Sequence, residues 1–344
     1  MAQQSQEDEM IVIAHRGASG ERPEHTLAAY DLAIAQGADY IEPDLVPTAD
    51  GVLVARHENA IGGTTDVADR PEFAERRTTK VVDGEEVTGW FTEDFTLAEL
   101  RTLRARERLP EIRPANTAYD GLYEVPTLAE VIQLVQASEE QSGRPIGLYP
   151  ELKHPTYFEE LGFDVAATLV EQLHEAGYRG EDAPVFIQSF EIGVLVRLNE
   201  MTDLPLVQLV NVAGGPFDRQ DLTWPEMLGI DGMTEIARYA DGIGAPITLV
   251  LSEQGTSTGF VERAQSAGLL VHAWTLRREN AFLPPSLQRG EAPSDHGCAE
   301  QLLLMLQAVG VNGVFADQPG MAVEWRDRAA MPPCATRRPA DAER

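Results

Sequence analysis

Three carboxylates stand at spacings that would let them share one cation. Glu42 and Asp44 are two residues apart in a short apolar run, so on an extended strand both side chains point to the same face. Glu151 and Lys153 repeat this spacing after a later run. Carboxylate oxygens from two strands suit a hard cation, and they predict one Ca²⁺ or Mg²⁺ ion bound by Glu42, Asp44 and Glu151. A metal-free cluster of ion pairs around Lys153 and Arg16 is the alternative.

Two histidines are placed to move protons beside these carboxylates. His15 ends the first apolar run, and the Asp50-Gly51 pair predicts a tight hairpin turn. With a two-residue turn, His57 lies directly opposite Asp44 and shares its face. Imidazole titrates near neutral pH, so His15 and His57 are the candidate general acid and base. Each alone would more often be an ordinary surface or core residue, but their convergence on three acids favours catalysis.

Arg16 and Lys153 are candidate contacts of an anionic substrate. Of the 27 basic residues two are lysines, Lys80 and Lys153, and a lysine kept at a strand end indicates a need for a compact charge. A GC-rich genome or adaptation to salt is the simpler cause of the general scarcity of lysine. Gln188 and Trp274 also stand in strand-like runs and are candidate substrate contacts. For Trp274, core packing is an equal alternative.

Four other histidines are weaker candidates. His25 precedes a helix, and we interpret it as a capping or packing residue rather than a catalyst. His174 lies in an acidic helical stretch and is expected to be solvated. His296 has no evident partner, and His272 is expected either near the site or in the core.

A fold that gathers strand ends would bring these residues together. Short apolar runs alternate with stretches of helical periodicity, which is typical of βαβ units and a parallel sheet. Eight runs are expected strands: residues 11–14, 40–44, 146–151, 185–189, 206–210, 242–245, 269–275 and 313–316. The helical stretches are residues 27–36, 128–136, 165–176, 192–199, 260–267 and 299–309. The pattern predicts an α/β fold, the TIM (β/α)8 barrel, whose catalytic residues sit at the carboxyl ends of the strands.

The barrel is expected to span residues 11–325 and to carry one insertion. The run at 52–55 follows the second strand too closely for a parallel crossover, so residues 40–56 predict a β-hairpin on the barrel rim. Residues 58–125 are rich in charge, Gly, Pro and Thr, and we expect a small inserted domain that caps the barrel mouth. The tail, residues 326–344, is expected to be disordered.

The charge of the chain limits its partners. The formal net charge is −29, from 56 acidic and 27 basic residues. Such a surface repels nucleic acid, so nucleic-acid binding is excluded, and an anionic substrate would need a local cation. No apolar run approaches the roughly 18 residues of a membrane span, so stable membrane insertion is not expected.

Two further features concern the cell compartment. The first ten residues lack the basic and apolar regions of a signal peptide, so we expect a cytoplasmic protein, or a periplasmic or secreted one if an export segment was trimmed. Cys298 and Cys334 are not spaced for a metal or redox pair, and their pairing is left open.

Several motifs occur together in one order along the chain. They are His15-Arg16-Gly17, Glu42 with Asp44, His57, Glu151-Leu152-Lys153, Gln188-Ser189-Phe190 and Trp274-Thr275. In this order the chain resembles the glycerophosphodiester phosphodiesterase family from about residue 11 to residue 319, and residues 15–26, 37–42 and 65–69 are similar to its bacterial periplasmic branch. Glu58, after His57, departs from the Asp that is more common there.

The resemblance implies a TIM barrel with an insertion after the second strand, and hydrolysis of glycerophosphodiesters to sn-glycerol 3-phosphate and an alcohol. In such enzymes the glycerol hydroxyl is thought to attack phosphorus, and water then opens the cyclic phosphate. The implied roles are a divalent cation at Glu42, Asp44 and Glu151, acid and base at His15 and His57, and phosphate contacts at Arg16 and Lys153.

Other functions remain open. The nearest is a lysophospholipase D-like enzyme or another phosphodiesterase on the same barrel, which a wide apolar mouth would favour. The charged residues of 58–125 favour a closed, polar mouth instead. Alternatives of another class are a non-catalytic glycerophosphodiester-binding barrel, which would be expected to lose a histidine or a carboxylate, and a metal-free structural barrel. The sequence does not indicate the preferred headgroup, the choice between Ca²⁺ and Mg²⁺, or the oligomeric state.

Overall fold

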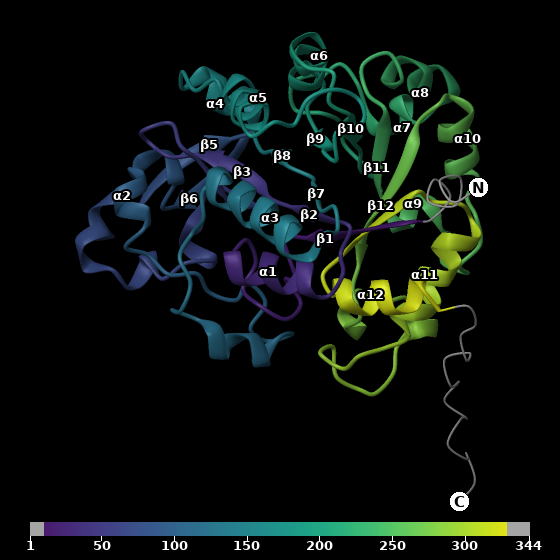
Figure 1. The fold of residues 1–344 in the computed structure, drawn as a ribbon, viewed down its shortest axis with the longest axis horizontal. Helices are drawn as coiled ribbons and strands as arrows, with labels where there is room; N and C mark the ends of the chain where they lie inside the picture. The colour runs from purple at the N-terminus through teal and green to yellow at the C-terminus, as the bar shows by residue number, and fades with distance from the viewer. Residues whose placement is uncertain (1–9, 329–344) are drawn as a thin grey trace, which may run out of the picture.

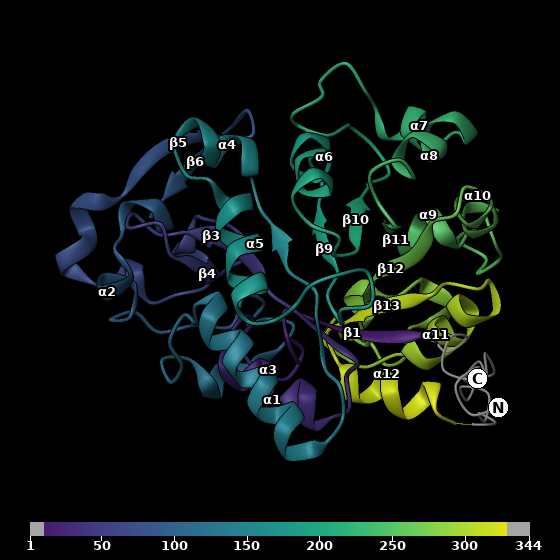
Figure 2. The same cartoon turned by 45° about the horizontal axis from the view of Figure 1, so that its top comes forward.

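The computed structural model describes residues 10–328, in which eight parallel strands form a ring surrounded by helices (Figure 1 and Figure 2). The ring consists of β1 (Ile11–His15), β2 (Tyr40–Glu42) with β3 (Asp44–Pro47), β7 (Gly147–Leu148) with β8 (Glu151–Leu152), β9 (Ile187–Ser189), β10 (Leu206–Leu209), β11 (Gly242–Pro246), β12 (Leu270–Leu276) and β13 (Gly313–Ala316). Each of the eight expected runs contributes a strand, and the predicted TIM barrel is confirmed.

Proline interrupts two strands of the ring. β2 and β3 form one strand broken at Pro43, and β7 and β8 form one strand broken at Pro150. Proline has no N–H to donate, but its carbonyl still accepts. Pro43 O accepts from Glu151 N at 3.0 Å and Pro150 O from Gln188 N at 2.9 Å. Pairing therefore continues across both breaks, and β1 closes the ring by pairing with β13 and β2.

Most helices follow the strands, as the periodicity predicts. They are α1 (Leu27–Ala35), α2 (Leu97–Leu100), α3 (Leu128–Ser142), α4 (Pro155–Glu160), α5 (Val165–Glu175), α6 (Ile192–Met201), α7 (Trp224–Met227), α8 (Ile230–Ile236), α9 (Ile247–Val250), α10 (Phe260–Ser266), α11 (Ala299–Ala308) and α12 (Pro319–Arg326). The Thr26 side chain caps α1, and Thr127 caps α3 with Glu130 in a reciprocal capping box. The sequence pattern did not predict α2, α4, α7, α8, α9 and α12, because helices of four to eight residues show little or no periodicity.

The rim hairpin is present, but its predicted register is wrong. β4 (Leu53–Ala55) pairs antiparallel with β3 across a loop of residues 49–51, in which Gly51 adopts a φ of +79°. The loop is one residue longer than the two-residue turn expected. Arg56, rather than His57, therefore stands opposite Asp44, and its N–H donates to Asp44 O at 2.9 Å.

Residues 58–125 leave the barrel between β4 and α3 and lie beside it (Figure 1, left). They contain the hairpin of β5 (Thr78–Val82) and β6 (Glu85–Gly89), the helix α2, and 3₁₀ turns at residues 61–63, 67–69, 71–76, 92–94 and 114–119. Phe73, Phe91 and Phe95 are buried in the same hydrophobic cluster as the barrel helices. Beyond α12, the expected disordered tail lies outside the described residues from position 329 onward, and so does Cys334.

The barrel interior is filled below its mouth. Ile13, Tyr149, Val207 and Phe315 form a buried cluster, and the rings of Tyr149 and Phe315 lie 5.0 Å apart. The strands of Tyr149 and Phe315 are not neighbours in the ring, so these two side chains meet inside it. Gly147 makes room here, because a Cβ at that position would stand 2.1 Å from the Tyr40 ring.

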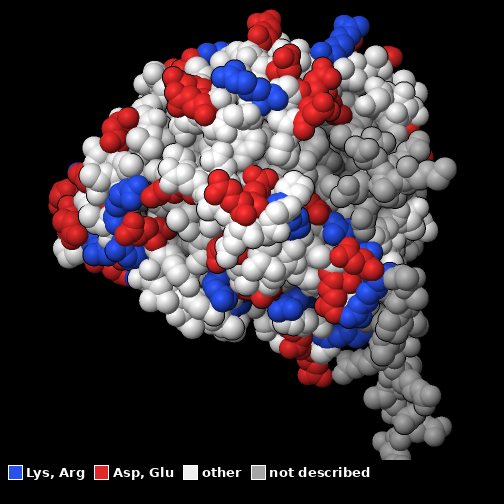
Figure 3. All heavy atoms as spheres, in the orientation of Figure 1, with Lys and Arg blue, Asp and Glu red and all other residues white. Residues whose placement is uncertain are grey.

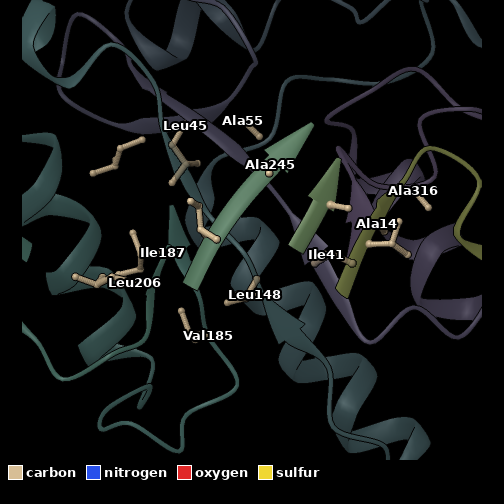
Figure 4. Close-up of a cluster of buried hydrophobic side chains, with 14 of the residues drawn as sticks. Ala14, Ile41, Leu45, Ala55, Leu148, Val185, Ile187, Leu206, Ala245 and Ala316 are labelled. Atoms are coloured by element: carbon tan, nitrogen blue, oxygen red, sulfur yellow. The ribbon is translucent and has the colours of Figure 1, made fainter. Parts of the chain in front are cut away.

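Side chains of the opposite parity face the surrounding helices and form the larger core. Figure 4 shows part of it, including Ala14, Ile41, Leu148 and Ile187. Acidic side chains are spread over the face shown in Figure 3, consistent with the formal charge of −29. Among the described residues, no helix has both the length and the apolar character needed to span a bilayer.

Candidate active site

Because side chains alternate along each strand, the polar residues near the strand ends point into the mouth of the barrel. A residue two positions after an interior side chain points the same way, one level nearer the carboxyl end of the strand. Such pairs are Ile13 and His15, Tyr149 and Glu151, Phe186 and Gln188, His272 and Trp274, and Phe315 and Asp317. A cavity of about 1340 Å³ opens at this end. Its walls include eight of the nine predicted site residues: His15, Arg16, Glu42, His57, Glu151, Lys153, Gln188 and Trp274.

The ninth residue, Asp44, completes a cluster of three buried carboxylates. One oxygen each from Glu42, Asp44 and Glu151 lies within 4.8 Å of the others. Burial and the two neighbouring acids raise the pKa of Glu42 well above its usual range. Burial likewise raises the pKa of Glu151 to about 8, although Lys153 opposes the rise. Keeping these carboxylates close together therefore costs free energy of folding, and a bound divalent cation would reduce this cost.

The donor set fits a hard cation. All three groups are carboxylates, and Asp44 Oδ1 is buried without a hydrogen-bond partner among the described residues. Glu42 is already oriented, because Oε2 accepts from Arg16 N at 2.8 Å and Oε1 accepts from Gln188 Nε2 at 3.0 Å. Oxygen ligands of this kind are those of Ca²⁺ and Mg²⁺.

His25 positions Asp44, a role that sequence reasoning missed. Its Nε2 lies 2.9 Å from Asp44 Oδ2 and its Nδ1 lies 2.7 Å from the Tyr30 hydroxyl, with the ring fully buried. Thr26, not His25, caps α1. Although burial acts to raise the pKa of Asp44, contact with His25 helps to hold it well below its usual range. One cluster member therefore stays ionised while its neighbours tend to hold protons.

His57 is held by a chain of charged groups from three segments. Its Nδ1 lies 2.5 Å from Glu58 Oε1, and Arg108 bridges Glu58 to Glu24 with Nη2–oxygen distances of 2.6 Å on each side. Burial, with the nearby cations Lys153 and Arg16, lowers the pKa of His57 to about 3. The ring is therefore neutral at neutral pH, and with Nδ1–H directed to Glu58 the unprotonated nitrogen is Nε2, which lies 3.3 Å from Lys153 Nζ.

His15, at the end of β1, is held in the same manner. Its Nδ1 lies 2.6 Å from Asp317 Oδ1. Asp317 Oδ2 in turn accepts from Arg113 at 2.5 Å and from Arg277 at 2.7 Å. Burial, followed by the charge of Arg16, lowers the pKa of His15 to about 4. Both candidate acid–base groups are thus neutral imidazoles anchored at Nδ1 by a buried or half-buried carboxylate.

The two candidate phosphate contacts lie between these histidines and the carboxylates. Lys153 Nζ is 2.9 Å from Glu151 Oε1 and 3.3 Å from His57 Nε2. Arg16 Nη1 is 3.2 Å from Glu24 Oε2, and its Nε is 3.4 Å from Asp44 Oδ2. An anionic group entering the cavity would meet both cations.

Gln188 and Trp274 reach the site differently. Gln188 orients Glu42, as described above, which places it behind the carboxylates as well as in the cavity wall. Trp274 lines the cavity beside Phe190, with ring centroids 6.1 Å apart, and its buried Nε1 has no hydrogen-bond partner among the described residues. Its place in the wall favours the substrate-contact interpretation over simple core packing.

The other histidines stand apart from the cavity. His272 is buried in the barrel interior, where Nδ1 lies 2.7 Å from the Tyr149 hydroxyl. His174 contacts Thr202 at the surface. Of the anchoring groups, Asp317 and Glu58 adjoin a strand end and a predicted histidine, and these were signals available in the sequence. Arg108 gives no such signal.

Comparisons with known proteins identify relatives of this chain. The model of the glycerophosphoryl diester phosphodiesterase family matches residues 15–321. A glycerophosphodiester phosphodiesterase of Arabidopsis thaliana is 36% identical over 324 residues, covering 90% of this chain and 83% of that protein. A glycerophosphodiester phosphodiesterase of Haemophilus influenzae is 29% identical over 356 residues, covering 94% and 92%.

Solved structures share the fold. A glycerophosphoryl diester phosphodiesterase from Silicibacter pomeroyi aligns with a TM-score of 0.65 at 21% identity, covering 93% of each chain. An Oleispira antarctica phosphodiesterase, solved in complex with the product sn-glycerol-3-phosphate, aligns with a TM-score of 0.62 at 23% identity, covering 93% of this chain and 98% of that chain. The match of the family model over most of its length shows that the chain belongs to the glycerophosphoryl diester phosphodiesterase family.

Proposed function

We propose that this chain, an enzyme of the glycerophosphodiester phosphodiesterase class, hydrolyses glycerophosphodiesters to sn-glycerol 3-phosphate and an alcohol. The observation that carries the proposal is the placing of two histidines, each anchored at Nδ1 by a carboxylate, in the cavity that also holds Lys153 and adjoins the cluster of three acids. The product complex of the Oleispira antarctica protein supports a small-molecule substrate of this kind.

A divalent cation, Ca²⁺ or Mg²⁺, would be held by Glu42, Asp44 and Glu151. When bound it would supply positive charge to the phosphate oxygens. Lys153 and Arg16 add two further cationic groups at the same place, so charge that develops on the phosphate during the reaction is stabilised from several directions.

Proton transfer falls to His15 and His57. In the first step one imidazole accepts the proton of a glycerol hydroxyl as its oxygen attacks phosphorus. The other imidazole enters this step protonated at Nε2 as well as at Nδ1, and it donates the Nε2 proton to the departing alcohol oxygen as that P–O bond breaks. In the second step water opens the cyclic phosphate, and the two groups exchange roles. Because each Nδ1–H is directed to a carboxylate, Nε2 is the nitrogen at which each imidazole would accept or donate the proton that moves.

Residues 58–125 are proposed to cap the barrel mouth. Arg108 and Arg113, both from this segment, reach the carboxylates that anchor the two histidines. The segment would therefore complete the site as well as cover it.

The decisive assay measures release of glycerol 3-phosphate from several glycerophosphodiesters, with and without a chelator. Activity should be lost on chelation and restored by Ca²⁺ or Mg²⁺. His15→Ala and His57→Ala should each lower kcat by roughly 10²–10⁴. The control, His174→Ala, lies outside the cavity and should be neutral. Tight binding of intact diesters without turnover would instead support a non-catalytic binding barrel, and full turnover without metal would remove the cation from the mechanism.

One observation favours a second candidate, a lysophospholipase D-like activity. The far wall of the 1340 Å³ cavity is apolar, with Ile247, Leu251, Leu287, Leu302 and Met305 along it. This wall is wider and less polar than the sequence of 58–125 suggested, and an acyl chain on the glycerol would fit it. A rise in kcat/KM from glycerophosphocholine to lysophosphatidylcholine would favour this activity, and a fall would favour the deacylated substrate.

A further inference from the structure

A second, smaller cavity adjoins the candidate active site. Its volume is about 410 Å³, and it shares Glu151, Lys153, Phe190 and Asn211 with the larger cavity. Its remaining walls come from the β5–β6 turn, from the start of α4 and from the loop after β10. A substrate whose phosphate contacts Lys153 could therefore extend one of its two alcohol groups into this space.

Two acids give the small cavity a negative wall. Glu191 is 4% exposed, its Oε2 accepts from Thr156, and its Oε1 is buried without a hydrogen-bond partner among the described residues. Asp83 stands in the tight β5–β6 turn with a φ of +48°, and its Oδ2 lies 2.5 Å from His154 Nδ1. Asp83 Oδ1 is likewise buried and unpartnered within the described part of the chain. Each acid thus keeps one oxygen that a ligand cation could engage.

Aromatic rings form the other wall. Phe190 and Trp224 lie edge to face with centroids 6.2 Å apart. Phe217 lines the same cavity, and its Cε2 would be 3.7 Å from a Cβ on Gly84, so it meets the turn that carries Asp83. Aromatic faces combined with carboxylates are the surroundings in which proteins bind quaternary ammonium groups.

The pKa of Glu191 is consistent with a carboxyl group that has no ion pair among the described residues. Burial raises its pKa to about 7, while the hydrogen bonds from Thr156 oppose the rise and Asp83 and Asp218 add to it. An organic cation in the cavity would lower the cost of ionising Glu191. Lys153, at the shared wall, already pairs with Glu151.

We propose that the small cavity binds the ammonium group of a cationic alcohol, choline above all, so that zwitterionic glycerophosphodiesters are preferred over those with a neutral alcohol. This inference rests on the proposed function and names its substrate class. The phosphate and the ammonium of glycerophosphocholine are joined by two carbons. This short link matches a cavity that would bind a cation and that directly adjoins the proposed phosphate contact Lys153. The glycerol half would then occupy the larger cavity.

The test compares kcat/KM for glycerophosphocholine, glycerophosphoethanolamine and glycerophosphoglycerol in the full-length protein. The wild type should prefer the choline diester over the glycerol diester by on the order of tenfold, the factor expected from a buried cation–aromatic contact. The double variant Asp83→Asn, Glu191→Gln should lose this preference, because KM for the choline diester should rise by about tenfold more than KM for the glycerol diester. Phe217→Leu should weaken the choline diester more than the ethanolamine diester.

A matched control is Glu159→Gln, which removes an exposed acid of α4 that pairs with Arg197 outside the cavity. It should leave the preference unchanged. Calorimetry with choline chloride alone gives a readout that does not depend on turnover, and binding should be present in the wild type and lost in the double variant. Equal rates on all three diesters, or absence of choline binding with the thermal midpoint intact, would overturn the inference while leaving the phosphodiesterase activity standing. Choline binding in a protein that hydrolyses none of them would support the cavity and reject the proposed function.

Discussion

His57 Nδ1 lies 2.5 Å from Glu58 Oε1, and Arg108 fixes that carboxylate from the other side. Burial acts to raise the pKa of Glu58, but hydrogen bonds from His57 and Arg108 hold it below its usual range. The glutamate at this position thus reaches the imidazole and stays charged.

Glu58→Gln should therefore lower kcat by at least about tenfold, because a neutral amide stabilises the protonated imidazole less than a carboxylate does. KM and the thermal midpoint should change little, since the Glu58 side chain is 37% exposed. The control is Glu72→Gln, an exposed acid of the same segment. An unchanged kcat with normal stability would show that Glu58 does not act through His57.

Glu42→Gln should abolish most activity while preserving the fold. Removing one of three clustered carboxylates relieves repulsion, so without metal the variant should be at least as stable as the wild type. Gln keeps an oxygen for the hydrogen bond from Arg16 N. The measurement is the thermal midpoint with and without Ca²⁺ or Mg²⁺. The wild type should be stabilised by the ion and the variant much less, and equal stabilisation of both would place the ion elsewhere.

Lys153→Arg should lose much of the activity although the charge is kept. Lys153 Nζ sits between Glu151 and His57, where a planar guanidinium is bulkier and could pair with the carboxylates in place of a cation. Lys80→Arg is the matched control, because Lys80 pairs with Glu93 and Asp94 away from the cavity, and it should be silent. Near-normal kcat/KM and thermal midpoint for Lys153→Arg would leave a purely structural role.

Glu191→Gln should stabilise the protein at high pH and not at low pH. The folded-state pKa of Glu191 is raised to about 7 from 4.5, chiefly by burial, so its contribution to stability is complete below pH 4.5 and is lost as pH rises through 7. Gln remains neutral throughout and can still accept from Thr156. The gain at pH 8 should be up to about 3 kcal/mol at 1.36 kcal/mol per pKa unit.

The check is thermal unfolding of the variant and the wild type at pH 4.5 and pH 8, with Glu159→Gln beside them as an exposed control. A gain of equal size at both pH values would mean that ionisation of Glu191 is not the cause.

The placing of the candidate catalytic groups followed from the sequence to a large extent. Apolar runs separated by helical periodicity predict parallel strands, and the carboxyl ends of parallel strands in one barrel meet at one mouth. That rule alone brings His15, Glu42 and Glu151 together from three strands. Alternation along each strand then decides which side chains point inward, as the pairs Ile13 and His15 show.

The hairpin is the element whose register the sequence analysis predicted wrongly. Side chains alternate with a period of two, so one extra loop residue at 49–51 moved the register by one and set Arg56 opposite Asp44. His57 nevertheless lines the cavity, because it stands beyond the end of β4, where strand alternation no longer applies. His57 therefore reaches the cavity as expected, but not through the hairpin register from which it was predicted.

The sequence by itself determined the strands, the order of the polar strand ends and the chemistry they could perform. Only the tertiary structure decided which groups hold them. Asp317 anchors His15 from 302 residues away, and Arg108 anchors Glu58 from 50 residues away. Such contacts exist because the ring closes and because an irregular segment folds back so that Arg108 reaches Glu58. Local spacing in the sequence does not encode how the ring closes or where a segment without periodicity runs. These partners, and the small cavity beside Lys153, therefore form only when the whole chain packs together.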